Sequence, residues 1–310
     1  MSISILNRGA SGGLKPELTV TAPSGSTLYL LQNGIIVATY TLGVSETEHT
    51  FTVRVGTYTV RGMLGTHTKS FEVVIDTVGR FCTEIVYGVP VSSLPEGSLV
   101  KLNENGSPVE FYVAKHDYEP ALNGTGRTLL VRKPVNERRI MDSYTVVIDC
   151  TSFLDADLYA WLNADYKNRF ESTAQEAMGI TRFYHTNGLY ASSVSPVQGS
   201  VFIPSYYEMG YTYEDSYNNV RLYNEGSILP IANRIYQDKV GSSSDYHNSE
   251  WTRSRVAAST GGFFSWGKNA DGSFVRVAGE VTLALLVRPC FTFPETALFD
   301  PDTMLFTGWY

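Results

Sequence analysis

The chain has 310 residues, a formal net charge of −7 at pH 7, 18% charged residues and 13% aromatic residues. This length suits two domains with a core each, and the few charges and many aromatics exclude a disordered chain. There is no basic run for nucleic acid and no apolar stretch of about 20 residues for membrane insertion. The N-terminus lacks a signal-peptide pattern, so we expect synthesis in the cytoplasm.

Residues 1–14 are rich in glycine and serine and predict a flexible attachment arm, with a frayed terminus as the alternative. Residues 15–88 follow as short alternating strands separated by glycine-rich turns. One turn, Asn33 and Gly34, is typical of a two-residue hairpin. The spacing predicts an all-β, antiparallel, Ig-like sandwich. Residues 89–97 contain two prolines and a glycine and predict a linker.

Residues 98–310 combine strand and helix patterns and predict a second, α+β domain. Asn105 and Gly106 predict another hairpin turn. A helix is expected from Ser152, where a capping pattern precedes apolar residues at helical spacing. The capping pattern pairs Ser152 with Asp155. The apolar residues at helical spacing are Leu154, Leu158, Trp161 and Leu162. Shorter helices are expected at residues 173–178 and 228–236.

Cysteine and histidine spacing argues against a metal site. Cys82, Cys150 and Cys290 are far apart and odd in number, so we expect three reduced thiols. The five histidines form no zinc-binding spacing. Asp271 and Gly272 suggest calcium, but a hairpin turn is the preferred interpretation. We therefore expect no metal and no cofactor.

A recurring pattern occupies the C-terminal part of the chain. Trp251 and Arg253 begin a Trp-x-Arg-Ser motif, an Asp-Gly turn follows, and Arg288 precedes a proline. The pattern resembles a bacterial and phage domain of unassigned function. That domain is related in layout to the C-type-lectin-like fold of formylglycine-generating enzymes and phage tropism determinants. The resemblance covers about residues 97–294 and includes the helix of Trp161. It implies a C-type-lectin-like fold for residues 98–310.

Two further resemblances concern the N-terminal part. A Gly-Thr-Tyr-Thr-Val stretch, residues 56–60, resembles the small Ig-like, PEGA-type modules of bacterial and phage surface proteins. Residues 6–14, followed by a β-module, resemble the start of tail and virion proteins from phages of gut Firmicutes. Together they imply a phage virion protein, on the tail or decorating the capsid.

An enzymatic function is disfavoured. Formylglycine-generating enzymes end near a Phe-Arg-Cys, and Cys290 stands in the comparable place here. Those enzymes hold copper with a nearby cysteine pair, whereas no second cysteine lies within 100 positions of Cys290. We interpret Trp251, Arg253 and Arg288 as buried structural residues, with ligand contact as the alternative for Trp251 and Arg253.

The segment around residues 206–223 is the candidate ligand-binding surface, because it is dense in tyrosine, asparagine and acidic residues. Aromatic faces stack on sugars while amides and carboxylates bond their hydroxyls. The candidate residues are Tyr206, Tyr207, Tyr211, Tyr213, Tyr217 and Asn218, with Tyr246 and Trp266 from neighbouring segments. Packing between loops or subunits is the alternative.

We therefore expect a non-enzymatic virion protein that attaches to other virion proteins through its N-terminal region. Its lectin-like domain would bind a host-surface or mucosal ligand, in the first instance a glycan. Weak single sites of this kind favour a homo-oligomer or an array. The alternative is a purely structural capsid-decoration or tail protein whose lectin-like domain makes intersubunit contacts. A bacterial surface adhesin is disfavoured by the missing signal peptide.

Overall fold

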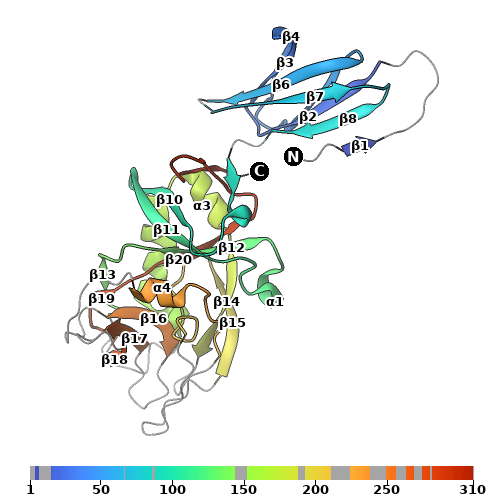
Figure 1. The fold of residues 1–310 in the computed structure, drawn as a ribbon. Coiled ribbons are helices and arrows are strands. Elements are labelled where there is room, and N and C mark those ends of the chain that lie inside the picture. The colour runs from blue at the N-terminus through green and yellow to red at the C-terminus, as the bar shows by residue number, and fades with distance from the viewer. Residues whose placement is uncertain are drawn as a thin grey trace. The chain divides into compact units, whose positions relative to one another are not determined.

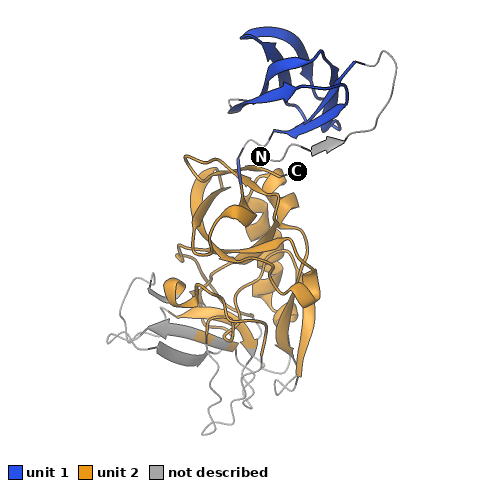
Figure 2. Ribbon diagram, turned by 45° about the vertical axis from the view of Figure 1, so that its right-hand side comes forward, with its two compact units in different colours: residues 1–89, 310 blue, residues 90–309 orange. Residues whose placement is uncertain are grey.

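The computed structural model describes residues 4–6, 15–65, 67–85, 88–143, 152–187, 193–210, 224–237, 249–255, 263–268, 274–279 and 281–309. The chain is mostly β-sheet and contains several sheets. It divides into two compact units, residues 1–89 with residue 310, and residues 90–309 (Figure 2). None of the helices in these ranges has the length and apolar character to cross a membrane.

The first unit is built from two four-stranded sheets, of order β1-β8-β2-β5 and β4-β3-β6-β7 (Figure 1). The strands of the first sheet are β1 (Ser4–Leu6), β2 (Glu17–Thr21), β5 (Glu48–Thr52) and β8 (Arg80–Glu84). Those of the second sheet are β3 (Thr27–Gln32), β4 (Ile35–Thr41), β6 (Gly56–Leu64) and β7 (His67–Ile75).

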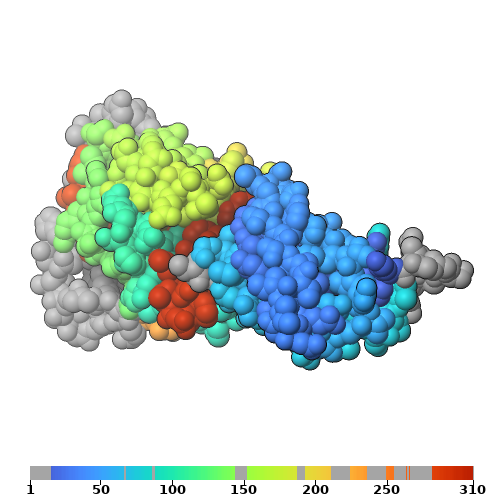
Figure 3. Space-filling model, turned by 90° about the horizontal axis from the view of Figure 1, so that it is seen from above, coloured from blue at the N-terminus to red at the C-terminus, as the bar shows by residue number. Residues whose placement is uncertain are grey.

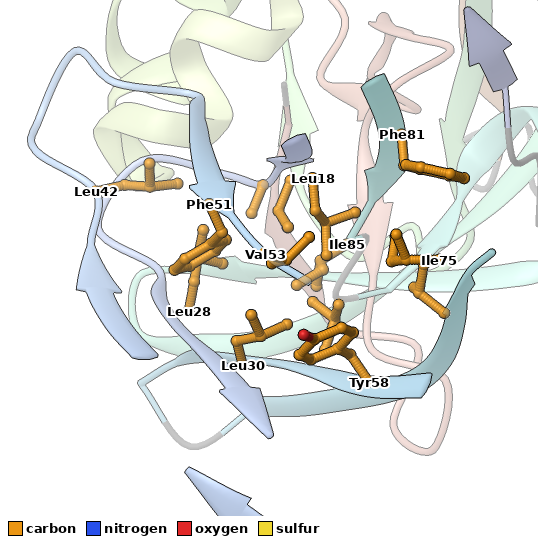
Figure 4. Packing of buried hydrophobic residues seen from close by; sticks show 14 residues of the cluster. Leu18, Leu28, Leu30, Leu42, Phe51, Val53, Tyr58, Ile75, Phe81 and Ile85 are labelled. Carbon is orange, nitrogen blue, oxygen red and sulfur yellow. The ribbon is translucent and has the colours of Figure 1, made fainter. Parts of the chain in front are cut away.

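One hydrophobic core holds these two sheets together (Figure 4). Leu18 of β2, Leu28 of β3 and Val60 of β6 are completely buried, whereas their neighbours along each strand are more exposed. This alternation is what a strand with one face on a core requires, because successive side chains point to opposite faces. Burial of apolar surface is therefore the main force that stabilises the unit.

The Asn33-Gly34 hairpin is confirmed. Both residues have positive φ, 51° and 77°, which is the conformation that a two-residue hairpin turn of this type requires. The expectation of a wholly antiparallel unit is wrong at one place. Strand β2 pairs in parallel with β8, because the chain returns to that sheet after crossing through the other one.

The second unit contains four sheets among the described residues, of order β10-β11-β12-β20, β13-β19-β16-β17-β18, β14-β15 and β22-β21-β9. The strands are β9 (Val89–Pro90), β10 (Leu99–Glu104), β11 (Ser107–Lys115), β12 (Arg127–Arg132), β13 (Arg138–Arg139), β14 (Thr181–Asn187), β15 (Ser193–Gly199), β16 (Glu250–Arg255), β17 (Phe263–Lys268), β18 (Phe274–Gly279), β19 (Leu285–Leu286), β20 (Cys290–Pro294), β21 (Leu298–Phe299) and β22 (Phe306–Gly308). The β10–β11 hairpin turns at Asn105 and Gly106, as predicted.

The helices of this unit are short. They are α1 (Pro120–Asn123), α2 (Asp157–Trp161), α3 (Ser172–Met178) and α4 (Ala232–Gln237), with further single turns at Val91–Ser93, Phe153–Asp155, Leu162–Tyr166 and Lys167–Arg169. The helix expected from Ser152 forms, but it is not continuous, since its first turn is separate from the helical stretch that begins at Asp157. Ser152 does cap a turn, accepting a bond from the N–H of Leu154, but extended backbone at Ala156 separates that turn from α2.

The two ends of the second unit lie side by side. Lys101 of β10 forms an isolated parallel bridge with Leu305, near the C-terminus. In the space-filling view, the red C-terminal part of the chain lies beside the teal part of the same unit (Figure 3). Most of the stretch predicted as a linker, residues 89–97, also packs on this unit. Val91 is completely buried and its N–H bonds the carbonyl of Ala297 at 2.8 Å. The division between the units therefore falls after Val89, at the beginning of that stretch.

The core of the first unit generates a stability prediction. Leu28→Ala should lower the free energy of unfolding of this unit by about 2–5 kcal/mol, because it leaves a cavity in a close-packed core. Ile36→Ala is the matched control, since Ile36 is 51% exposed on the neighbouring strand and its truncation should change little. Urea unfolding of the full chain measures both. Equal losses in the two variants would contradict the assignment of the core.

Candidate functional site

Strand β16 carries the Trp-x-Arg-Ser motif. It lies between β19, with which it is parallel, and β17, with which it is antiparallel (Figure 1). Trp251 is completely buried, and its indole Nε1 donates to the carbonyl of Arg139 at 2.9 Å. A buried indole needs such a partner for its single donor, so Trp251 anchors β16 to the strand that contains Arg139.

Arg253 is completely buried two residues further along the same strand. Its guanidinium donates to the Glu208 carboxylate at 2.6 Å and to the carbonyls of Ile203 at 2.8 Å, Tyr184 at 2.8 Å and Glu225 at 3.1 Å. A charge removed from water is costly unless it is paired and hydrogen-bonded. Arg253 meets both conditions, because one carboxylate and three carbonyls accept hydrogen bonds from its guanidinium.

Two aromatic rings complete the surroundings of this guanidinium. Its central carbon lies 5.2 Å from the ring centre of Phe183 and 5.6 Å from that of Phe202, and the two rings stack on each other at 4.4 Å. Burial lowers the pKa of Arg253, but the charges and hydrogen bonds of its neighbours, Glu208 first among them, together raise it by more, so the pKa ends above its ordinary value. Arg253 is therefore permanently charged.

Glu208 is the anion of the cluster and is also completely buried. Besides Arg253, it accepts hydrogen bonds from the hydroxyl of Tyr118 at 2.6 Å and from the N–H of Ser205 at 2.9 Å. Burial, together with the negative charge of Glu208, raises the pKa of Tyr118 well above its usual value. The phenol consequently stays protonated and keeps donating to the carboxylate.

Glu225 is the second buried carboxylate. It accepts hydrogen bonds from the hydroxyl of Ser254 and from the N–H of Thr186, and its own carbonyl accepts from Arg253. Burial raises the pKa of Glu225, while the charge of Arg253 and these hydrogen bonds oppose the shift. Ser254 also accepts from the N–H of Tyr206 at 2.8 Å, so the motif serine links the two acidic segments.

These contacts fix the two ends of the tyrosine-rich segment. The described chain breaks off after Gly210 and resumes at Asn224. Arg253 binds Glu208 just before this interval and Glu225 just after it. We call Arg253, Glu208, Glu225, Ser254 and Tyr118 the Arg253 clamp. Residues 208 and 225 therefore bind the same buried guanidinium, which fixes the distance between these two points of the chain.

A second buried ion pair stabilises the other end of β16. The Arg288 fork bonds the two carboxylate oxygens of Glu250 at 2.8 and 3.0 Å, and it also donates to the carbonyls of Arg132 and Lys133, both at 2.7 Å. Arg288 is only 2% exposed. Bidentate pairing of this kind adds geometric specificity as well as energy, so Arg288 acts as a strut between β16 and β12.

Trp161 belongs to a third cluster. The guanidinium of Arg139 lies 4.4 Å and that of Arg169 lies 5.2 Å from its ring, in cation–π geometry. Arg169 also forms ion pairs with Glu104 at 3.3 Å and Glu137 at 2.7 Å. Trp161 is 9% exposed and thus mostly buried. Its surroundings are those of a packing residue at the edge of the core.

His185 and Cys290 lie near the clamp without joining it. Burial and then the positive charge of Arg253 lower the pKa of His185 to about 4, so the ring is neutral near pH 7. Its Nε2 shares a hydrogen bond of 2.8 Å with the Ser152 hydroxyl. Burial raises the pKa of Cys290, whose thiol faces the carbonyl of Phe202 at 3.4 Å. Cys82 and Cys290 are free thiols, and Cys150 is outside the described residues.

The structure changes the expected role of Tyr206. Its side chain is 3% exposed, so it belongs to the base of the tyrosine-rich segment and not to a contact surface. Tyr207 is half-buried. Trp266 is in β17, but its side chain is not described. The remaining predicted ligand residues lie outside the described residues, as does the Asp271-Gly272 turn. They are Tyr211, Tyr213, Tyr217, Asn218 and Tyr246.

Sequence reasoning missed the partners of Arg253. Glu208 and Glu225 are 45 and 28 positions away from it, and Tyr118 lies between β11 and α1, still further away along the chain. The only available signal was the presence of acidic residues on both sides of the tyrosine-rich segment. Within the described ranges, histidine, cysteine, aspartate and glutamate side chains form no group of three that could hold a metal ion.

Residues 125–295 match the model of the family described as Domain of unknown function (DUF6273), which is 171 of the 310 residues. The chain belongs to the DUF6273 family. The matched region contains both buried ion pairs of β16 and all members of the Arg253 clamp except Tyr118. No curated protein matches the chain.

The clamp of this DUF6273 domain makes a quantitative prediction. Arg253→Met should cost about 3–5 kcal/mol of unfolding free energy, because it leaves the Glu208 carboxylate buried without a counter-charge. Arg80→Met is the control, since the Arg80 side chain is 73% exposed and its surface ion pair contributes about 1 kcal/mol or less. Urea unfolding measures the difference. A loss no larger than that of the control would contradict a stabilising clamp.

The lowered pKa of His185 predicts how the stability of the fold depends on pH. A histidine whose pKa is lower in the folded state stabilises the fold above its unfolded value of 6.5, and that stability is lost as the pH falls toward 4. The melting temperature of the wild type should therefore fall more steeply between these values than that of His185→Gln. Glu225 has a raised pKa and acts with the opposite sign, so the comparison of the two proteins isolates His185. Parallel curves would contradict the prediction.

Proposed function

We propose that this chain is a non-enzymatic phage virion protein that displays a C-type-lectin-like domain and binds a host-surface or mucosal glycan. In this proposal the binding residues are those of the tyrosine-rich segment, above all Tyr211, Tyr213 and Tyr217, with Asn218. The first unit, as an Ig-like module, attaches the protein to other virion components together with residues 1–14.

The observation that carries the proposal is the Arg253 clamp. A buried arginine binds the chain near the beginning of the tyrosine-rich segment, at Glu208, and just after its end, at Glu225. Binding residues are commonly carried by segments that a rigid scaffold positions. The clamp supplies such a scaffold, because both anchoring points are fully buried and hydrogen-bonded. A segment held in this way presents its side chains with less loss of entropy on binding.

The chemistry of the segment fits a sugar. Tyrosine rings stack on the apolar faces of sugar rings and their hydroxyls bond sugar oxygens, while amides such as that of Asn218 bond sugar hydroxyls. The charged groups of the clamp are saturated by one another, since each carboxylate receives several donors and the guanidinium bonds four acceptors. This arrangement suits a support for binding better than a reacting group.

One observation favours the second candidate, a purely structural decoration or tail protein. Tyr206, which sequence reasoning placed on the contact surface, is packed inside the second unit. If the other tyrosines pack in the same way against a neighbouring subunit, the lectin-like domain makes intersubunit contacts instead of binding a glycan. The experiment below separates the two candidates.

The test compares the wild type with a Tyr211→Ala, Tyr213→Ala double variant on a glycan array and for attachment to host cells. Single glycan sites are weak and gain strength from multivalency, so the protein is presented on beads at high density. We expect binding by the wild type and a loss of about tenfold or more in the variant, since two aromatic contact surfaces are removed and each loss of about 1.4 kcal/mol lowers the affinity tenfold.

Tyr29→Ala is the control, because Tyr29 is a half-buried tyrosine of the first unit. It should bind as the wild type does. A folded double variant that binds equally well would show that these tyrosines are not the site. Absence of binding by the wild type, with protection of the same tyrosines in assembled particles, would replace the proposal by the structural candidate.

A further inference from the structure

Strand β4 is the edge of its sheet, whose order is β4-β3-β6-β7. In the described part of the chain, the outer side of its backbone pairs with no other strand. Three consecutive apolar side chains at its beginning are exposed: Ile35 at 69%, Ile36 at 51% and Val37 at 52%. An edge strand with free backbone groups and exposed apolar residues is a template for pairing with another strand.

Two of the other three edge strands of this unit carry charges that discourage such pairing, and the third, β1, has only three residues and no charge. The opposite edge of the same sheet, β7, contains Lys69 and Glu72, and β5 at an edge of the other sheet begins with Glu48. The sequence of β4, Ile-Ile-Val-Ala-Thr-Tyr-Thr, contains no charged residue and no proline. Glu46, just beyond the strand, is held by the Tyr40 hydroxyl and the Gly43 N–H.

A bulge divides β4 into two parts. Leu30 pairs with Ala38 and Leu31 with Ile36, so Val37 is the extra residue. A bulge bends the strand locally and interrupts regular pairing, but the part from Ala38 to Thr41 remains in register with β3. Pairing along the outer edge is therefore open to residues 38–41, while Ile35, Ile36 and Val37 are available for apolar packing beside it.

We propose that β4 pairs in antiparallel orientation with β4 of a second copy of this chain, so that two four-stranded sheets join into one. The charge of the chain favours this edge. At a net charge of −7, two copies repel each other, and β4 brings no like charges together on approach. Antiparallel pairing of a strand with itself is an isologous, closed two-fold contact, and it places β-branched residues of one copy against those of the other.

The size of the contact sets its strength. One strand with three exposed apolar side chains buries less than the about 800 Å² per partner of a standard interface, so the dimer is a weak one. Weak pairing is sufficient where many copies are held close together. The inference stands without the proposed glycan-binding function, since it concerns only the first unit.

Sedimentation velocity of the full chain over a range from about 1 to 500 μM tests the pairing. We expect a concentration-dependent dimer in the wild type. Val37→Lys should weaken it by about tenfold or more, because it places a charge on an apolar contact and sets like charges near each other across the two-fold axis. Thr39→Lys, at an exposed position of the regular part of the same strand, should do the same.

Val74→Lys is the matched control. Val74 is 57% exposed and lies on β7, the opposite edge of the same sheet, so the change of residue and of charge is identical. It should leave the dimer constant within about twofold, since distant surface substitutions change little. A wild type that remains monomeric over the whole range would overturn the proposal. So would a dimer that all three variants weaken equally, or one that none of them weakens.

Discussion

The buried guanidinium of Arg253 is the interaction on which the second unit depends. A permanent charge inside a protein is stable only when an anion and enough acceptors surround it. Here the anion is Glu208 and the acceptors are three backbone carbonyls, all supplied by segments distant in sequence. Because each of these groups would be left unsatisfied without the others, the four segments that carry them are held in one arrangement.

Strand β16 transmits this constraint to the rest of the unit. Near its beginning Glu250 forms the bidentate pair with Arg288, and next to it Trp251 bonds the carbonyl of Arg139. One short strand thus connects two buried ion pairs and a buried indole. So many polar groups in a small region favour a single packing arrangement. If one partner of an ion pair moves away, the other charge is left buried without a partner, which is costly.

The two units are stabilised by different interactions. The first unit relies on an apolar core between two sheets, in which alternating side chains of β2, β3 and β6 meet (Figure 4). The second unit adds satisfied ion pairs to its apolar core. This difference fits a division of roles in which the first unit provides edges for assembly and the second provides a fixed base for a recognition segment. Both roles are proposals, and both depend on surfaces rather than on a reactive group.

Local chemistry determined what the sequence by itself predicted correctly. The hairpins at Asn33-Gly34 and Asn105-Gly106 follow from backbone preferences of two residues, and the alternation in β2 and β3 follows from the period of a strand. Such preferences act over a few residues and do not need the rest of the chain. The expected helix at Ser152 shows their limit, because extended backbone at Ala156 interrupts it although the capping residue was identified.

Only the tertiary structure decided which groups neutralise the buried charges. The Trp-x-Arg-Ser motif marked Arg253 as a candidate for burial, but nothing in the local sequence points to Glu208, Glu225 or Tyr118. A buried arginine requires acceptors at hydrogen-bonding distance, and it accepts them from any part of the chain. The sequence therefore determined the elements and the residue that needed partners, and the fold chose the partners, because Coulomb attraction and hydrogen bonding depend on separation in space and not on separation along the chain.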